Sequence, residues 1–168
     1  MILETERLRL RRLSLDDAAF MVDLLNEPSF LRFIGDKGVR TLDDARDYLR
    51  EGPMASYERH GFGLYLVELK EKGDPMGICG LVKRDALEDV DVGFAFLPAF
   101  WLKGYAFESV SAVIAYERRT LGLRRIVAVT QSDNVGSIKT LEKVGLTFEG
   151  MVRLSEEGPT LQLFASDG

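Results

Sequence analysis

Apolar and charged positions alternate at the start of the chain, where Leu8 and Leu10 stand among three arginines. A period of two residues is typical of a strand with one buried face. The pattern changes at Ser14-Leu-Asp-Asp17, where a capping residue precedes two acids and predicts the start of a helix. We expect this helix to run to about Asn26 and to end before Pro28.

The next segment carries further helical signals, separated by glycine and proline. A short helical piece is expected over residues 30–34. Thr41-Leu-Asp-Asp44 repeats the capping signal and predicts a second helix to about Arg50. Gly52-Pro53 kinks or breaks that helix, because proline lacks the amide donor that a helix interior uses, and the helix resumes as far as His60.

Three apolar segments follow over residues 62–69, 76–83 and 90–97. Each is bounded by residues that favour turns, and the connections between them are short. Short connections of this kind join neighbouring antiparallel strands. The sequence therefore predicts an antiparallel meander.

Helices and strands alternate in the last part of the chain. Residues 106–121 predict a long helix, and residues 126–130 a β-branched strand parallel to the strand at 90–97, because a helix joins the two. The remaining elements are a helix over residues 134–144 and strands near residues 146–151 and 161–165. This order predicts one domain over residues 1–168 of the α+β (α/β) class, with a central mixed sheet.

Composition and charge narrow the classes of partner. Apolar residues make up 46% and charged residues 29% of the 168 positions, as in ordinary globular proteins. A net charge of −5 disfavours nucleic acid and anionic membranes as general partners. No apolar stretch approaches the ~18 residues of a membrane span, and charges interrupt the N-terminus, so we expect no signal peptide and a cytoplasmic location.

Cys79 and His60 are the only residues of their kinds. One cysteine cannot form an intrachain disulfide, and its apolar neighbours predict a buried, inert thiol. One histidine excludes a multi-histidine metal site, and without a nucleophile-elbow sequence it gives a Ser-His-Asp hydrolase no support. We therefore expect no metal, and a structural place for His60 at a helix end.

The segment from Asp91 to Glu108 carries the most specific chemistry. An apolar strand enters a glycine-containing turn, which opens directly into the long helix. Free backbone N–H groups at a helix start attract anions, and the helix dipole adds to this. Lys103 adds a charge beside the turn, while Gly104 and Ala106 leave the backbone open to phosphate oxygens. A purely structural turn that needs Gly104 only for its conformation is the alternative.

A second segment runs from Asn134 to Leu146, with Asn134 at a helix cap and Ser137 in the first turn. Together the two segments resemble the GNAT superfamily of acetyl-CoA-dependent N-acetyltransferases, in particular its RimJ/RimL-like branch of ribosomal-protein N-terminal acetyltransferases. The matching residues are Trp101-Leu-Lys-Gly-Tyr-Ala-Phe-Glu-Ser109, Asn134, Ser137, Leu141-Glu-Lys143, Gly145-Leu146, Glu149-Gly150 and the opening Leu3-Glu-Thr-Glu-Arg-Leu-Arg-Leu10.

The resemblance implies the GNAT fold, a mixed and mostly antiparallel sheet of about seven strands flanked by about four helices. It also implies a V-shaped splay between the fourth and fifth strands, here residues 90–97 and 126–130. In that gap the pantetheine arm pairs with exposed strand backbone, as an added strand would.

By the same resemblance, acetyl-CoA is the co-substrate. Its pyrophosphate is held by the backbone N–H groups of Leu102, Lys103, Gly104, Tyr105 and Ala106. Asn134 contacts the cofactor arm, and Lys143 or Lys139 meets the 3′-phosphate of the adenosine. Leu102 replaces the usual glycine of the turn, so its contact requires a negative φ.

Three side chains are candidates for the chemistry, since amide formation needs a neutral amine. Alternation along residues 90–97 places Asp91 on a face otherwise lined by glycine and alanine, as a general base or as a strand-end carboxylate facing water. Leu141 stands where many family members have a tyrosine acid, so Ser137 becomes the candidate to protonate the thiolate. Glu149 is the candidate to orient or deprotonate the amine.

The expected function is transfer of an acetyl group to a primary amine by direct attack. The acceptor is a small-molecule amine or a protein N-terminus. An acyl-CoA-binding sensor or partner module with weak or no transferase activity is the alternative, because the tyrosine acid is absent. The oligomeric state stays open, with a homodimer paired through the apolar final strand as one option.

Overall fold

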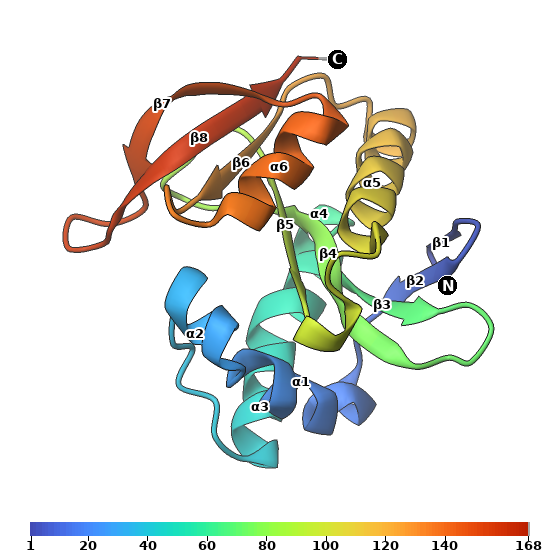
Figure 1. Cartoon of the computed structure of the whole chain (residues 1–168). Helices are drawn as coiled ribbons and strands as arrows, with labels where there is room; N and C mark the ends of the chain where they lie inside the picture. The colour runs from blue at the N-terminus through green and yellow to red at the C-terminus, as the bar shows by residue number, and fades with distance from the viewer. Residues whose placement is uncertain (168) are drawn as a thin grey trace.

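The computed structural model describes residues 1–167 as an eight-stranded sheet with helices on both faces (Figure 1). The strand order is β1-β2-β3-β4-β5-β6-β8-β7, and only β5 and β6 are parallel neighbours. The strands are β1 (Leu3–Glu4), β2 (Leu8–Arg12), β3 (Leu64–Leu69), β4 (Pro75–Val82), β5 (Asp91–Phe96), β6 (Ile126–Thr130), β7 (Thr147–Arg153) and β8 (Thr160–Ser166). The predicted meander is β3-β4-β5, and the predicted GNAT-type mixed sheet is confirmed.

The helices begin where the capping signals predict them. Ser14 and Thr41 both form capping boxes, with Asp17 and Asp44 as the reciprocal acids. The helices are η1 (Leu15–Asp17), α1 (Ala18–Leu25), α2 (Pro28–Phe33), α3 (Leu42–Leu49), η2 (Arg50–Met54), α4 (Ala55–His60), η3 (Pro98–Phe100), α5 (Tyr105–Leu121) and α6 (Val135–Val144). The expected break at Gly52-Pro53 is a π-helical turn, η2, which carries α3 into α4 without an interruption.

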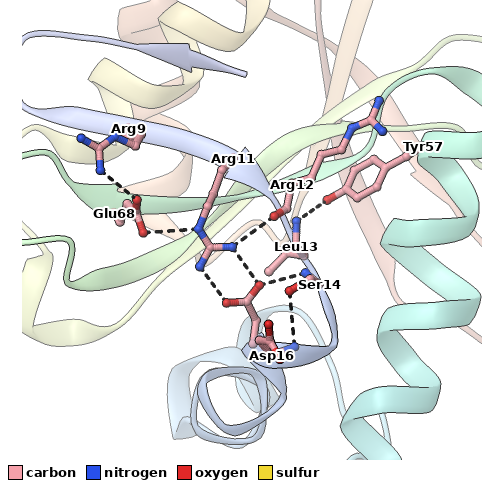
Figure 2. Close-up of polar contacts among 9 residues, drawn as sticks. Arg9, Arg11, Arg12, Leu13, Ser14, Asp16, Tyr57 and Glu68 are labelled. Carbon is pink, nitrogen blue, oxygen red and sulfur yellow. Dashed lines mark hydrogen bonds and ion pairs between the residues drawn. The ribbon is translucent and has the colours of Figure 1, made fainter. Parts of the chain in front are cut away.

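Polar contacts join the start of the sheet to the first helix (Figure 2). The Arg11 guanidinium donates to both carboxylate oxygens of Asp17, at 3.0 and 2.8 Å, and the backbone N–H of Ser14 donates to the same carboxylate. The Tyr57 hydroxyl of α4 accepts a hydrogen bond from the Leu13 N–H at 2.9 Å. Glu68 of β3 forms ion pairs with both Arg9 and Arg11, so these two arginines of β2 have a protein partner as well as solvent.

Two hydrophobic clusters lie on opposite faces of the sheet. One contains Val110 and Val113 of α5 together with Leu141 of α6, and the other contains the buried residues of α1, α2 and α3. Val92 belongs to the α5 cluster, whereas Ala95 borders the other one. The β4–β5 register is unbroken, so the alternation predicted along β5 holds without a bulge.

The strands β5 and β6 separate almost at once. Their register contains one pair, Asp91 with Val127, supported by a 3.0 Å hydrogen bond from the Val127 N–H to the Val90 carbonyl. The V-shaped splay expected between the fourth and fifth strands thus lies between β5 and β6, because the two-residue β1 adds a strand that the pattern did not predict.

The last strand does not offer an edge to a partner. β8 is paired on one side with β6 and on the other with β7, so the edge strands are β1 and β7. The idea of a homodimer paired through the final strand is therefore wrong in its choice of strand. Within residues 1–167, no helix combines the length and the apolar character that crossing a membrane requires.

Gly80 provides a test of how closely β3 and β4 pack. A Cβ at this position would lie 2.0 Å from the Gly63 carbonyl oxygen, which is a backbone atom that cannot move alone. We expect Gly80→Ala to lower the free energy of unfolding by about 1–3 kcal/mol, as overpacking does, measured by urea denaturation. Gly136→Ala is the control, since a Cβ there meets nothing within 4 Å, and unchanged stability in Gly80→Ala would contradict the packing.

Candidate functional site

The start of α5 has no side-chain cap. Gly104 occupies the N-cap position with φ of 81°, whereas the shorter α6 is capped by the Asn134 side chain. Within residues 1–167, the N–H groups of Gly104, Tyr105 and Ala106 donate no hydrogen bond, and Lys103 precedes them in the turn. These amides and the helix dipole together make a site that suits an anion.

Arg7 fixes the conformation of this turn from the loop before β2. Its Nη1 donates to the Lys103 carbonyl at 2.9 Å, and its guanidinium lies 4.4 Å from the centre of the Tyr105 ring. Its Nε donates to Glu108 at 2.7 Å, and the Thr5 hydroxyl donates to the other oxygen of that carboxylate at 2.5 Å. Burial works to raise the pKa of Glu108, but these hydrogen bonds bring it below its usual value.

Sequence reasoning missed Arg7 as a support of the turn. In the chain it is one of several arginines in an alternating strand, and its partners lie about a hundred positions away. Only the pairing of β2 with the sheet brings the two segments together.

Leu102 does not meet the condition on which its predicted contact depended. Its φ is 61°, and its side chain is fully exposed at 104%. The backbone contact expected from Leu102 required a negative φ, so this residue drops out of the predicted set of amides. The turn is anchored instead by Trp101, whose indole N–H donates to the Phe96 carbonyl at 2.8 Å.

The second predicted segment lies beside the turn. Asn134 and Ser137 come together, since the Ser137 N–H donates to the Asn134 side-chain oxygen at 3.2 Å. Leu141 is fully buried below them. The Lys143 ammonium lies 4.5 Å from the centre of the Phe107 ring, so it joins α6 to α5, whereas Lys139 faces the cavity described next.

A cavity of about 1010 Å³ connects these elements. It begins at the uncapped start of α5 and the first turn of α6, and it runs through the splay, where residues of both β5 and β6 line it. Residues of α2, the η2 turn and α4 also line it. Its lining includes Gly104, Tyr105 and Ser137 at the two helix starts. It also includes Asp91, Arg84 and Lys37.

Asp91 lies within this cavity and is only 1% exposed. The water-facing alternative is therefore wrong. The Nε of Arg84 donates to both carboxylate oxygens, each at 3.2 Å. Burial raises the pKa of Asp91, although the Arg84 charge acts against that rise. A buried carboxylate of this kind accepts a proton more readily than an exposed one.

Glu149 is not brought to the cavity. It lies on β7 and accepts two hydrogen bonds from Arg125, at 3.0 and 2.5 Å. Hydrogen bonding from Arg125 lowers the pKa of Glu149, which makes it a weaker base. Arg125 also binds Asp89 and Asp167, so Glu149 belongs to a surface cluster of charges.

Cys79 and His60 are the remaining residues that the sequence singled out, and His60 also lines the cavity. Burial raises the pKa of the Cys79 thiol to about 12, which leaves it protonated and inert as predicted. His60 ends α4, and its ring stacks on Phe62 with 5.3 Å between centroids. Among the side chains of residues 1–167, no group of three or more His, Cys, Asp and Glu lies together as metal ligands would.

Known proteins share sequence with this chain. The chain matches the acetyltransferase (GNAT) domain family over residues 7–147. It is 30% identical over 149 residues to the uncharacterized N-acetyltransferase YjdG of Bacillus subtilis, covering 86% of this chain and 88% of that protein. It is 29% identical over 154 residues to the uncharacterized N-acetyltransferase YoaA of Bacillus subtilis, covering 90% and 86% of the two.

Solved structures share the fold. The chain superposes on an acetyltransferase from Agrobacterium tumefaciens with a TM-score of 0.83 and 22% identity, covering 99% and 94% of the two chains. It superposes on the ribosomal L7/L12 α-N-protein acetyltransferase RimL, in complex with coenzyme A, with a TM-score of 0.85 and 17% identity, covering 99% and 97%.

The conformation of Leu102 can be tested by its stability. A left-handed residue with a Cβ costs roughly 1–2 kcal/mol, and added glycine flexibility in the unfolded chain offsets about 0.4–1 kcal/mol of any relief. We expect Leu102→Gly to raise the free energy of unfolding by about 0.5–1 kcal/mol. Leu102→Ala keeps the strain and should match the wild type in the same urea titration; equal stability of all three proteins would argue against a strained turn.

Proposed function

This chain belongs to the GNAT acetyltransferase family, and from that premise we propose that it transfers the acetyl group of acetyl-CoA directly to a primary amine. The observation that carries the proposal is the continuity of one cavity from the uncapped start of α5 to the buried carboxylate of Asp91. A donor lying along the cavity has its anionic part and its reacting carbon at these two places.

We propose that the pyrophosphate of the donor is bound by the N–H groups of Lys103, Gly104, Tyr105 and Ala106. Support comes from the free amides of the turn and from the dipole of a 17-residue helix. The Asn134 side chain keeps its amide donors for the pantetheine arm, because only its oxygen is used as the cap. Lys139 or Lys143 meets the 3′-phosphate, and Lys139 has the better support since it lines the cavity.

Acetyl-CoA supplies an acyl group activated as a thioester. In the proposed reaction the amine nitrogen forms a bond to the acyl carbon, the carbon–sulfur bond breaks, and its electron pair leaves on sulfur. Asp91 takes the proton that the amine loses, directly or through a water. The Ser137 hydroxyl, at the head of α6, orients the proton that returns to the sulfur.

A binding module without transferase activity is the second candidate. It is favoured by Leu141, which is buried and apolar where many family members carry a tyrosine acid. A screen of peptides, polyamines, aminoglycosides and amino acids, followed by thiol release, separates the two. If acetyl-CoA binds but no acceptor raises the rate of thiol release above the rate without an acceptor, the protein is a binding module and not a transferase.

The role of Asp91 predicts a separation of catalysis from donor binding. Asp91→Asn removes the base but keeps the shape of the side chain, so we expect kcat to fall by about 10²–10⁴-fold. The dissociation constant for acetyl-CoA, measured by calorimetry, should stay the same. Because its pKa is raised, wild-type kcat/KM should decline on acidification at a pH above the ~3.9 of an ordinary aspartate. Retention of kcat in the variant would remove Asp91 from the mechanism.

The support that Arg7 gives to the turn predicts an effect on the donor. Arg7→Ala removes its hydrogen bonds to Lys103 and Glu108, so the amides lose their fixed arrangement. We expect the affinity for acetyl-CoA to fall about tenfold, which corresponds to one charge-assisted hydrogen bond. Arg9→Ala is the control, since Arg9 pairs with Glu4 and Glu68 away from the turn. Equal affinities in the two variants would show that Arg7 does not position the amides.

A further inference from the structure

The guanidinium group of Arg84 is only partly used by the protein. Its Nε donates to both oxygens of Asp91, but within residues 1–167 neither Nη atom makes a hydrogen bond. The side chain is 36% exposed and lines the cavity beside β5. The four N–H donors on its Nη atoms therefore have no protein acceptor within residues 1–167 and are available to a ligand in the cavity.

Lys37 adds a second cation to the same end. It comes from the segment between α2 and α3 and lines the cavity, and no carboxylate within residues 1–167 forms an ion pair with it. Burial lowers the pKa of Lys37, and the positive charge of Arg84 lowers it further. Tyr48 of α3 also lines the cavity, where burial raises its pKa and the charge of Arg84 acts against that rise.

Two acids besides Asp91 line the cavity. Glu27 and Glu51 line it, yet among residues 1–167 neither forms an ion pair with Arg84 or Lys37. Asp91 offsets the charge of Arg84, but the Nη donors of Arg84 and the ammonium group of Lys37 have no ion-pair partner within residues 1–167. Together they suit an anion, since a carboxylate is bound well by paired cationic donors.

We propose that Arg84 and Lys37 bind the carboxylate of the acceptor, and that the acceptor is a free α-amino acid. This inference rests on the proposed transferase function. The Nε of Arg84 binds Asp91, so a carboxylate bound by the Nη atoms is separated from the base only by the guanidinium group. An α-amino acid carries its amine and its carboxylate on the same carbon. When the carboxylate is bound, the amine is therefore held beside Asp91.

Other amine acceptors lack this match. A protein N-terminus has a neutral amide in place of the carboxylate, which leaves the donors of Arg84 and Lys37 without an anionic partner. Polyamines and aminoglycosides bring additional positive charge, which the two cations repel. The same residues thus select for the acceptor and orient it.

The experiment compares each proteinogenic α-amino acid with its own α-carboxamide as an acceptor, at saturating acetyl-CoA. The carboxamide lacks the negative charge, and its α-amine has a lower pKa, which makes the neutral amine more abundant and so works against the expected preference. We expect kcat/KM for the best amino acid to exceed that of its carboxamide by at least about tenfold, as for a charge-assisted hydrogen bond. Carboxamides or N-terminal peptides that react as well as the amino acids, or better, would overturn the proposal and leave the transferase function intact.

A variant ties the preference to this site. Lys37→Met keeps the length of the side chain and removes its charge, so KM for the amino acid should rise about tenfold while kcat stays the same. The kinetics with the carboxamide should not change. Arg46→Met is the matched control, because Arg46 pairs with Asp43 on the surface of α3 and does not line the cavity. An equal effect of Lys37→Met on both acceptors would contradict carboxylate binding.

Calorimetry keeps this proposal separate from the proposed function. If no amine is acetylated, the transferase function fails, but titration of the acetyl-CoA complex with amino acids and carboxamides still measures the site. If the complex binds the amino acid but not the carboxamide, and Lys37→Met weakens that binding, the carboxylate site is supported. Equal binding of both, or of neither, would overturn it.

Discussion

The backbone of β5 sets the constraint on which the site depends. On one side it pairs with β4 along its whole length, and on the other it shares a single register pair with β6. The first contact fixes the alternation that sends Asp91 to the cavity, and the second leaves the strand open beside it. Closing the splay would pair the exposed backbone and remove the cavity. The sheet therefore gives up hydrogen bonds at the place where a substrate can supply them.

The turn before α5 is the second place where the protein leaves backbone groups unsatisfied. The helices η1, α3 and α6 begin at capping boxes or an asparagine cap, whereas α5 begins at a glycine with free amides. Arg7, itself held by Glu108, fixes this arrangement by contacts to the Lys103 carbonyl and the Tyr105 ring and does not occupy the amides. An ordered but uncapped helix start is pre-organised for an anion, so binding requires little rearrangement.

Much of the fold follows from local patterns in the sequence. The capping acids after Ser14 and Thr41 and the period-two alternation along β5 depend on neighbours in the chain, so they predict their elements well. The roles of Arg7 and Arg84 were not predictable in this way. Arg7 contacts residues almost a hundred positions away in the chain. Arg84 resembles any surface arginine in the sequence, and only the burial of its partner Asp91 distinguishes it. The positive φ of Leu102 was not predictable from its residue type, because residues other than glycine rarely adopt this conformation.

We propose that the donor lies along β5 with its anionic part on the turn before α5. Hydrogen–deuterium exchange of the backbone amides, with and without coenzyme A, tests this directly. The account predicts protection of the amides of Lys103 to Ala106 and of β5 on the side that faces the splay. Binding of coenzyme A that leaves both segments as unprotected as in the free protein would contradict it.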